Sequence, residues 1–144
     1  MKTLLLTLGA TLLLVGAAQA QKMTAAQVPA AVKATFKAKF PTVQRMTWEK
    51  EDANFEAGFQ LGGKTMSAVI TPAGALQETE TDLRVSELPA AVRATLARDY
   101  KAYKVNEAAT IARADGTTVY EAEVAKGGKQ QDVLFTADGK VAPR

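Results

Sequence analysis

Residues 28–40 read VPAAVKATFKAKF, and residues 88–100 read LPAAVRATLARDY, so one pattern occurs twice at a shift of 60 positions. Pro, Ala, Ala, Val, Ala and Thr are identical in the two copies, and Phe40 and Tyr100 keep an aromatic ring at the end. In each copy the apolar residues follow the i, i+3, i+4, i+7 spacing of one helical face. Each copy is therefore predicted to begin with an amphipathic helix whose apolar side is buried.

A second stretch of repetition follows each predicted helix, because residues 55–76 align with residues 120–141. The identical residues of the first copy are Glu56, Ala57, Gly62, Gly63, Lys64, Thr71 and Gly74. Repetition at this period indicates one supersecondary unit used twice. Since a unit of about 60 residues buries only a marginal share of its surface alone, the two units are expected to share a core or a continuous sheet.

The Gly pairs predict two β-hairpins. If Gly62-Gly63 forms a two-residue turn, Phe59 pairs with Met66 and Phe55 with Ile70. The same pairing around Gly127-Gly128 sets Tyr120, Ala122 and Val124 opposite Phe135, Val133 and Gln131. In both hairpins the large apolar side chains then share one face of the sheet.

The combined pattern predicts an α+β fold: a tandem repeat of a helix plus an antiparallel β-meander, with two helices packed on one face of an antiparallel sheet. Further strands are expected near residues 43–50, 75–81, 104–113 and 140–142, and Ser86 is a candidate N-cap of the second helix. The repeats span about residues 24–82 and 84–142 within a domain of residues 21–144. The opposite face of the sheet is expected to be exposed to solvent. The pattern is compatible with one continuous sheet for both repeats or with a separate sheet for each.

Residues 1–20 have the layout of a secretion signal: basic Lys2, an apolar run over residues 4–15, and Ala18-Gln19-Ala20 before an expected cleavage after Ala20. A membrane anchor is the alternative, but the run is shorter than the roughly 20 apolar residues that span a bilayer. The chain has no cysteine to carry a lipid. A periplasmic or secreted product is expected, not a lipoprotein and without a stable membrane anchor after cleavage.

Histidine and cysteine are both absent, which excludes Ser-His-Asp and Cys-His catalytic sites and the usual zinc sites. Catalysis by carboxylates alone stays open, but no pair of acids forms a recognisable motif. We therefore expect no enzyme and no cofactor. The 18 basic residues barely exceed the 15 acidic ones and are scattered along the sequence, so the charge pattern gives no indication of nucleic-acid binding.

Two groups of residues are candidate sites. The predicted register leaves a polar face that can receive a protein loop or a peptide, although it can equally be an ordinary solvated face. This face carries Glu56, Gln60, Thr65, Ser67, Glu121, Glu123, Gln130 and Asp132. The second group is Glu78, Glu80 and Asp82, which share one side of an extended strand. They are suited to a divalent cation, a small ligand or a basic partner, or to protecting an edge strand from association.

The repeated helix start (residues 28–32 and 88–92), the Phe/Tyr-Glu-Ala strand (residues 55–57 and 120–122) and the closing FTADGKV (residues 135–141) resemble the PepSY-like, beta-lactamase-inhibitor-like proteins of bacterial envelopes. The resemblance implies an exported protein similar in fold to beta-lactamase inhibitor protein, which binds an enzyme through its sheet. It also implies a non-enzymatic role, as an inhibitor or modulator of an envelope enzyme such as a peptidase, with an unidentified envelope protein or peptide as the partner.

Overall fold

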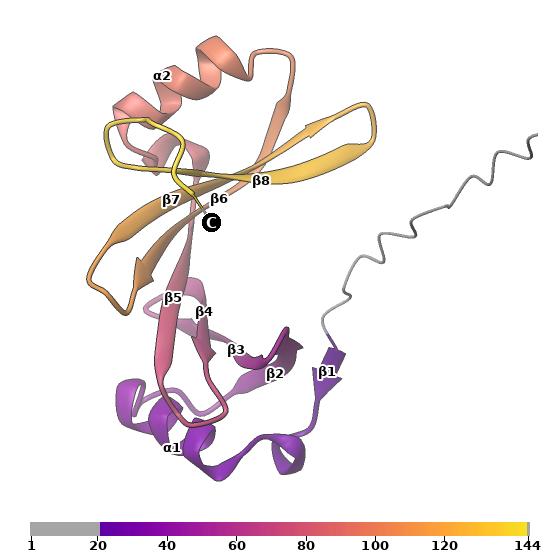
Figure 1. Ribbon diagram of the computed structural model, residues 1–144, viewed down its shortest axis with the longest axis vertical. Helices are drawn as coiled ribbons and strands as arrows, with labels where there is room; N and C mark the ends of the chain where they lie inside the picture. The colour runs from indigo at the N-terminus through magenta and orange to yellow at the C-terminus, as the bar shows by residue number, and fades with distance from the viewer. Residues whose placement is uncertain (1–20, 144) are drawn as a thin grey trace, which may run out of the picture.

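The computed structural model describes residues 21–143, and the predicted signal segment lies outside them. Eight antiparallel strands form one sheet in sequence order (Figure 1). They are β1 (Gln21–Met23), β2 (Met46–Glu51), β3 (Asn54–Leu61), β4 (Lys64–Ile70), β5 (Leu76–Leu83), β6 (Lys104–Arg113), β7 (Thr118–Lys126) and β8 (Lys129–Phe135). The helices are α1 (Ala30–Lys39) and α2 (Ala90–Asp99), each preceded by a 3-10 turn, η1 (Ala25–Gln27) or η2 (Val85–Glu87). Within residues 21–143, no helix combines the length and the apolarity needed to span a bilayer.

The tandem repeat is confirmed, and its two units share strand β5. This strand pairs with β4 as the last strand of the first unit, and it also pairs with β6 as the strand leading into α2. The two units therefore form one continuous sheet. Strand β1 was not predicted. It leads into α1 as β5 leads into α2, and it pairs with β2. Aligning Met23 with Leu83 at the repeat shift is the sequence signal that would have found it.

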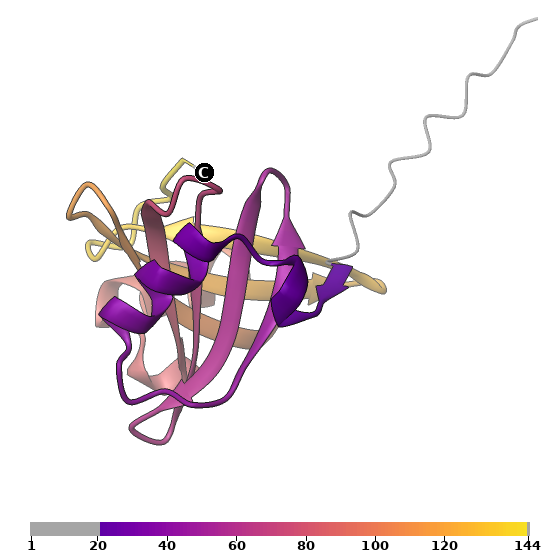
Figure 2. The ribbon, with the colours of Figure 1, turned by 90° about the horizontal axis from the view of Figure 1, so that it is seen from below.

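Each helix covers its own half of the sheet with the apolar stripe that the sequence predicts. Val32 and Phe36 of α1 are buried against Trp48, Phe55 and Phe59, and Val92 and Leu96 of α2 are buried in the equivalent cluster of the second half. Seen from below, α1 lies across the strands of the first half (Figure 2). The edge-to-face packing of Phe36 on Trp48, with ring centroids 5.5 Å apart, adds to the burial of both rings.

The predicted register of both hairpins is confirmed, from Phe55 opposite Ile70 to Leu61 opposite Lys64, and from Tyr120 opposite Phe135 onward. The side of the sheet opposite the helices is not entirely exposed to solvent, however. In the second half, Ile111, Val119 and Leu134 are buried there together with Ala142. The closing residues fold back along β8, where the Ala142 N–H donates to the Leu134 carbonyl at 2.8 Å. The expectation of a solvated face is wrong here because the segment near residues 140–142, predicted only as a further strand, packs Ala142 against this side.

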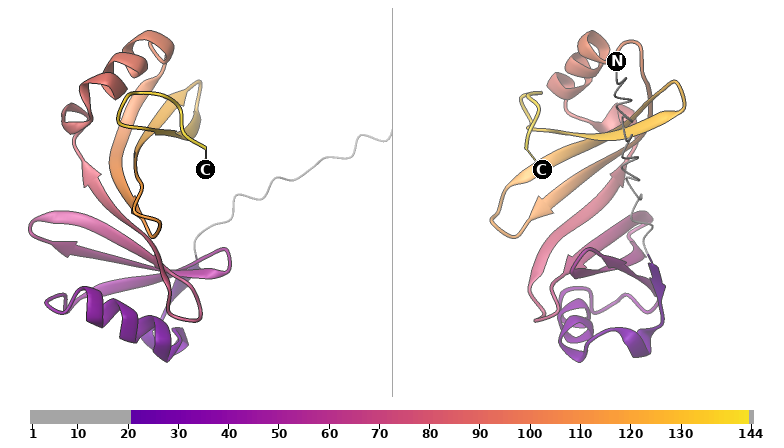
Figure 3. Two further views of the ribbon diagram at one scale, coloured as in Figure 1. Left: turned by 60° about the vertical axis from the view of Figure 1, so that its left-hand side comes forward. Right: turned by 45° about the vertical axis from the view of Figure 1, so that its right-hand side comes forward.

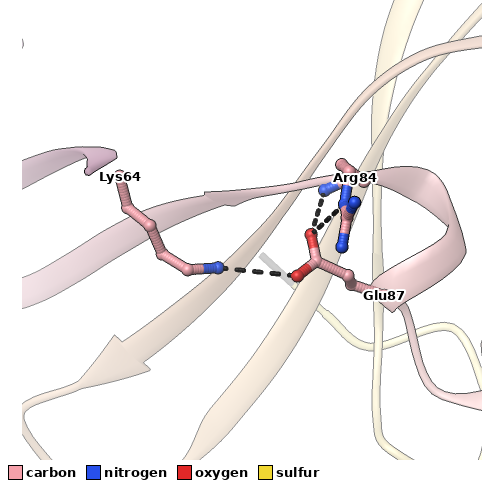
Figure 4. Close-up of polar contacts among 3 residues, drawn as sticks. All are labelled: Lys64, Arg84 and Glu87. Atoms are coloured by element: carbon pink, nitrogen blue, oxygen red, sulfur yellow. Dashed lines mark hydrogen bonds and ion pairs between the residues drawn. The ribbon is translucent and has the colours of Figure 1, made fainter. Parts of the chain in front are cut away.

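The start of the second unit differs from the prediction, because Ser86 lies inside η2 and α2 begins only after Pro89. Glu87 is the capping residue instead: its Oε2 accepts the Arg84 N–H at 2.8 Å. Its Oε1 lies 3.7 Å from the Nζ of Lys64, the first residue of β4 (Figure 4). The pair links the two units, but both side chains are substantially exposed, so the attraction is weak.

Candidate functional site

The candidate site is the side of the sheet that neither helix covers, called here the helix-free face. The strand register places all eight residues of the predicted polar face on it. In the first unit Gln60 lies opposite Thr65 and Ser67 opposite Gly58. In the second unit Glu123 lies opposite Asp132, while Glu121 and Gln130 occupy the same side of their strands. The hairpin turns alone were sufficient to predict this placement.

The second candidate group belongs to the same surface. Strand β5 sets Glu80 opposite Ser67 and Glu78 opposite Val69, so Glu78, Glu80 and Asp82 lie between the polar residues of the two units. The two sites that the sequence presents separately are therefore one face with β5 at its centre. Sequence reasoning did not include Glu49 and Glu51 of β2, which share this face because Glu49 pairs with Glu56.

Acidic residues are concentrated on the helix-free face. By register, ten of the 15 Asp and Glu residues of the chain lie on it: Glu49, Glu51, Glu56, Glu78, Glu80, Asp82, Glu107, Glu121, Glu123 and Asp132. The basic residues that the register places there are Lys22, Lys104 and Arg113. A chain with a formal net charge of +3 thus presents a strongly negative face, and a field of this kind selects and steers cationic partners.

The face is hollowed, because the helix-free sides of the two halves turn toward each other across β5 (Figure 3, left view). One hollow of about 270 Å³ lies over Gly58 and is bordered by Glu49, Glu56, Ser67 and Glu80. A second, of about 380 Å³, is lined by Glu51 of β2 and by Leu134 of β8. Since Glu80 lines both hollows, it occupies the junction between the two halves of the face.

The crowding of carboxylates changes their proton affinity. Burial, followed by the negative charges of Glu121, Glu56, Asp82 and Glu78, raises the pKa of Glu80 to about 7. Burial and the nearby carboxylates of Glu56, Glu78 and Asp52 also raise the pKa of Glu51. Both effects disfavour the charged form. Ionisation of the carboxylates at the centre of the face is therefore unfavourable, and a cation that binds there would make it more favourable.

The second unit stabilises one of its carboxylates with neutral amides. Glu123 Oε1 accepts hydrogen bonds from Asn106 Nδ2 and Gln130 Nε2, both at 3.0 Å. Glu123 and Gln130, two predicted site residues on neighbouring strands, are thus in direct contact, and Asn106 is an addition that the sequence did not indicate. The amides fix the carboxylate without neutralising its charge.

The cation hypothesis for Glu78, Glu80 and Asp82 gains no geometric support. Within residues 21–143, no group of three or more Asp or Glu side chains is arranged to hold a metal ion. Successive acids along one side of a strand project in parallel, so they form a charged row more readily than a coordination shell. The arrangement is suited to electrostatic recognition of an extended partner.

Comparison with known proteins places the chain in a family. The model of the family described as "Putative beta-lactamase-inhibitor-like, PepSY-like" matches twice, over residues 16–77 and 70–142. The two matches correspond to the two structural units. No curated protein matches the chain.

Several solved structures share the fold. A structure described as "putative periplasmic proteins" from Bacteroides eggerthii has a TM-score of 0.72 at 23% identity and covers 81% of this chain and 86% of its own. A DUF2874 family protein from Bacteroides uniformis has a TM-score of 0.72 at 22% identity, over 80% and 86%. A BLIP-like protein from Bacteroides fragilis has a TM-score of 0.66 at 22% identity, over 80% and 84%. With two matches that together span residues 16–142, the chain belongs to the beta-lactamase-inhibitor-like, PepSY-like family.

Proposed function

We propose that this protein is an exported, non-enzymatic binding module that contacts a protein or peptide through its helix-free face. The observation that carries the proposal is the form of this face: it is concave, has no helix over it, and holds ten acidic residues, eight of which line two adjacent hollows. A sheet surface of this kind offers a partner both shape and charge complementarity.

The family assignment supports a binding role, because the fold of the chain is that of beta-lactamase-inhibitor-like proteins. We propose that the chain acts as an inhibitor or modulator of an envelope enzyme. The identity of that enzyme must come from experiment. Fold alone does not specify it.

Export is the second part of the proposal. Residues 1–20 have the pattern of a cleaved signal, with the expected cleavage after Ala20. We propose that the mature protein is residues 21–144, one domain of two repeats in the periplasm or outside the cell.

Site-specific photocrosslinking tests the binding face. A photoreactive amino acid is placed at Gln60 or Gln130, exposed positions at the ends of the helix-free face in the two units. Matched controls carry it at Lys37 of α1 or Ala97 of α2, equivalent exposed positions on the two helices. Irradiation in an envelope extract of the source cells is expected to give the same partner adduct from Gln60 and Gln130 but not from the controls. Adducts from the helical positions alone would refute the proposal.

A further inference from the structure

Resting on the proposed function, we infer that the partner segment is cationic: an extended stretch of polypeptide whose Arg or Lys side chains enter the two hollows beside Glu80. The proposed function requires only that something docks on the helix-free face. The inference adds the chemistry of that partner and the point at which it is anchored.

Charge complementarity is the first argument. The helix-free face carries ten carboxylates, whereas Lys22, Lys104 and Arg113 are its basic side chains by register. An anionic segment would be repelled along the whole sheet, while a cationic one gains attraction at each strand that it crosses.

The construction of the second hollow is an independent argument. Its rim is charged and mostly acidic, with Ile111 and Leu134 as the apolar part of its lining. The charged lining residues are Glu51, Glu78, Glu80, Glu121, Asp132 and one cation, Arg113. These two apolar residues are buried, with exposures of 4% and 7%. An Arg or Lys side chain has the same division, an apolar stem and a charged end. The stem can lie along Ile111 and Leu134 while the cation lies among the carboxylates.

The protonation behaviour of the face agrees with this assignment. Burial and four neighbouring carboxylates disfavour the charged form of Glu80, raising its pKa. A cation placed beside Glu80 would offset that repulsion, so binding and ionisation of Glu80 should favour each other. The geometry points to Arg as the better occupant, because its planar guanidinium can engage two carboxylate oxygens at once.

A second copy of the chain is the competing occupant. The helical side carries exposed basic residues such as Lys33 and Lys37 of α1, so the helix-free face of one molecule is electrostatically matched to the helices of another. The two occupants differ in a measurable way: self-association raises the mass of the protein in solution without any added peptide.

The experiment uses residues 21–144 and three fluorescent dodecapeptides of alternating sequence: Gly-Arg, Gly-Ser and Gly-Glu. A face variant, Glu56→Gln/Glu78→Gln/Glu80→Gln, is compared with a control variant, Asp99→Asn/Asp115→Asn/Asp138→Asn, which removes the same number of carboxylates off the face. Circular dichroism verifies folding, and Glu80→Gln alone replaces the triple variant if that variant unfolds. Anisotropy should show binding of the Gly-Arg peptide only, about tenfold weaker in the face variant and within about twofold of wild type in the control.

Equal weakening in both variants would overturn the inference, because it would reveal attraction to net charge and not to this face. Binding of the Gly-Glu peptide would overturn it as well, as would self-association of the free protein that the face variant abolishes. If Gln60 and Gln130 crosslink a partner while the Gly-Arg peptide fails to bind, the cationic assignment is wrong and the proposed function stands. If those positions crosslink nothing, the proposed function itself fails.

Discussion

The Thr95 hydroxyl of α2 donates a hydrogen bond of 2.8 Å to the carbonyl of Gly139, in the turn that follows β8. The first unit has the same contact, from Thr35 of α1 to Gly74 at 2.6 Å. Each helix is thus attached to the closing turn of its own unit. The contact explains why the Ala-x-x-x-Thr of the helix and the Thr-x-x-Gly of the turn are repeated together in the sequence.

Gly139 should tolerate no side chain. Its φ of +82° is in the left-handed region, and an added Cβ would lie 2.5 Å from the Ala91 carbonyl oxygen. Gly139→Ala should lower the free energy of unfolding by about 3 kcal/mol, from the clash and the backbone strain together. Gly127→Ala is the matched control: its φ is +59°, but nothing lies within 4 Å of the added Cβ. That variant should lose only about 1 kcal/mol, and equal losses in urea unfolding would disprove the close approach.

The Thr95 hydroxyl should contribute measurably to stability. Replacing it with the isosteric Val leaves the Gly139 carbonyl without this donor in a buried position, and the expected loss is about 1–2 kcal/mol. Thr95→Ser keeps the hydroxyl and should lose less. Thr35→Val should also lose less, because that hydrogen bond is only partly buried. Urea unfolding of the three variants checks the order, and a Thr35→Val variant more damaged than Thr95→Val would contradict it.

Glu80 should destabilise the fold in a pH-dependent way. Its pKa is about 7 in the folded protein against an ordinary value of 4.5, so between these values the folded state binds more protons than the unfolded state. Stability from this group therefore falls as pH rises through that window. Glu80→Gln should be more stable than wild type by about 1–2 kcal/mol at about pH 8, a figure reduced for solvent screening.

At about pH 4 the advantage of Glu80→Gln should disappear, because Glu80 is protonated in the folded protein and mostly protonated in the unfolded chain. Melting temperatures across the pH range provide the measurement. Asp99→Asn is the control, since Asp99 is exposed and pairs with Arg98 at 2.7 Å, and it should show no gain at high pH. A constant difference between Glu80→Gln and wild type would show that Glu80 titrates normally.

Binding of the Gly-Arg peptide should weaken as pH falls from about 8 to about 6, by about three- to tenfold, because protonation of Glu80 removes charge at the junction of the two hollows. The groups that face Glu80 are Glu56 on β3, Glu78 and Asp82 on β5, Arg113 on β6, and Glu121 on β7. The chain has no histidine to titrate in this window. The pH dependence should flatten in Glu80→Gln, and an unchanged slope would assign it to another group.

The mature N-terminus can be measured directly. Intact mass spectrometry of the protein recovered from the periplasm or medium should give a chain that begins at Gln21. A retained residue 1 would contradict cleavage, and a start inside β1 would contradict the proposed domain boundary.

The sequence predicted most of the fold because its repeats are physically redundant. Two Gly-Gly turns independently fixed the same register, and the stripes through Val32 and Val92 independently fixed the same helix packing. Strand β1 was missed, since three residues carry no periodicity of their own. Ser86 was misassigned because a polar residue before Pro89 resembles an N-cap, while a 3-10 turn capped by Glu87 occupies that place.

The candidate site was only half predictable. Alternation along each hairpin placed Glu56 and Glu121 on one face, but nothing local linked them to Glu80, because β5 joins the units through pairings that sequence spacing does not specify. The concentration of acidic residues on one face could not be predicted for the same reason. Acidic and basic residues are mixed along the chain, and they are separated onto different faces only when the strands pair. The burial of Ile111 and Leu134 beneath the charged residues was not predictable either, because it depends on Ala142, which packs there where the chain returns along β8.

Methyl NMR tests the central claim most directly, because its probes report the two sides of the sheet separately. The methyl groups of Ile111 and Leu134 lie on the helix-free face, whereas those of Val32 and Val92 belong to α1 and α2 and are buried on the other side of the sheet. During titration with the Gly-Arg peptide, the signals of Ile111 and Leu134 should shift with peptide concentration while those of Val32 and Val92 stay in place. Shifts confined to Val32 and Val92 would put the partner on the helical side and contradict the account.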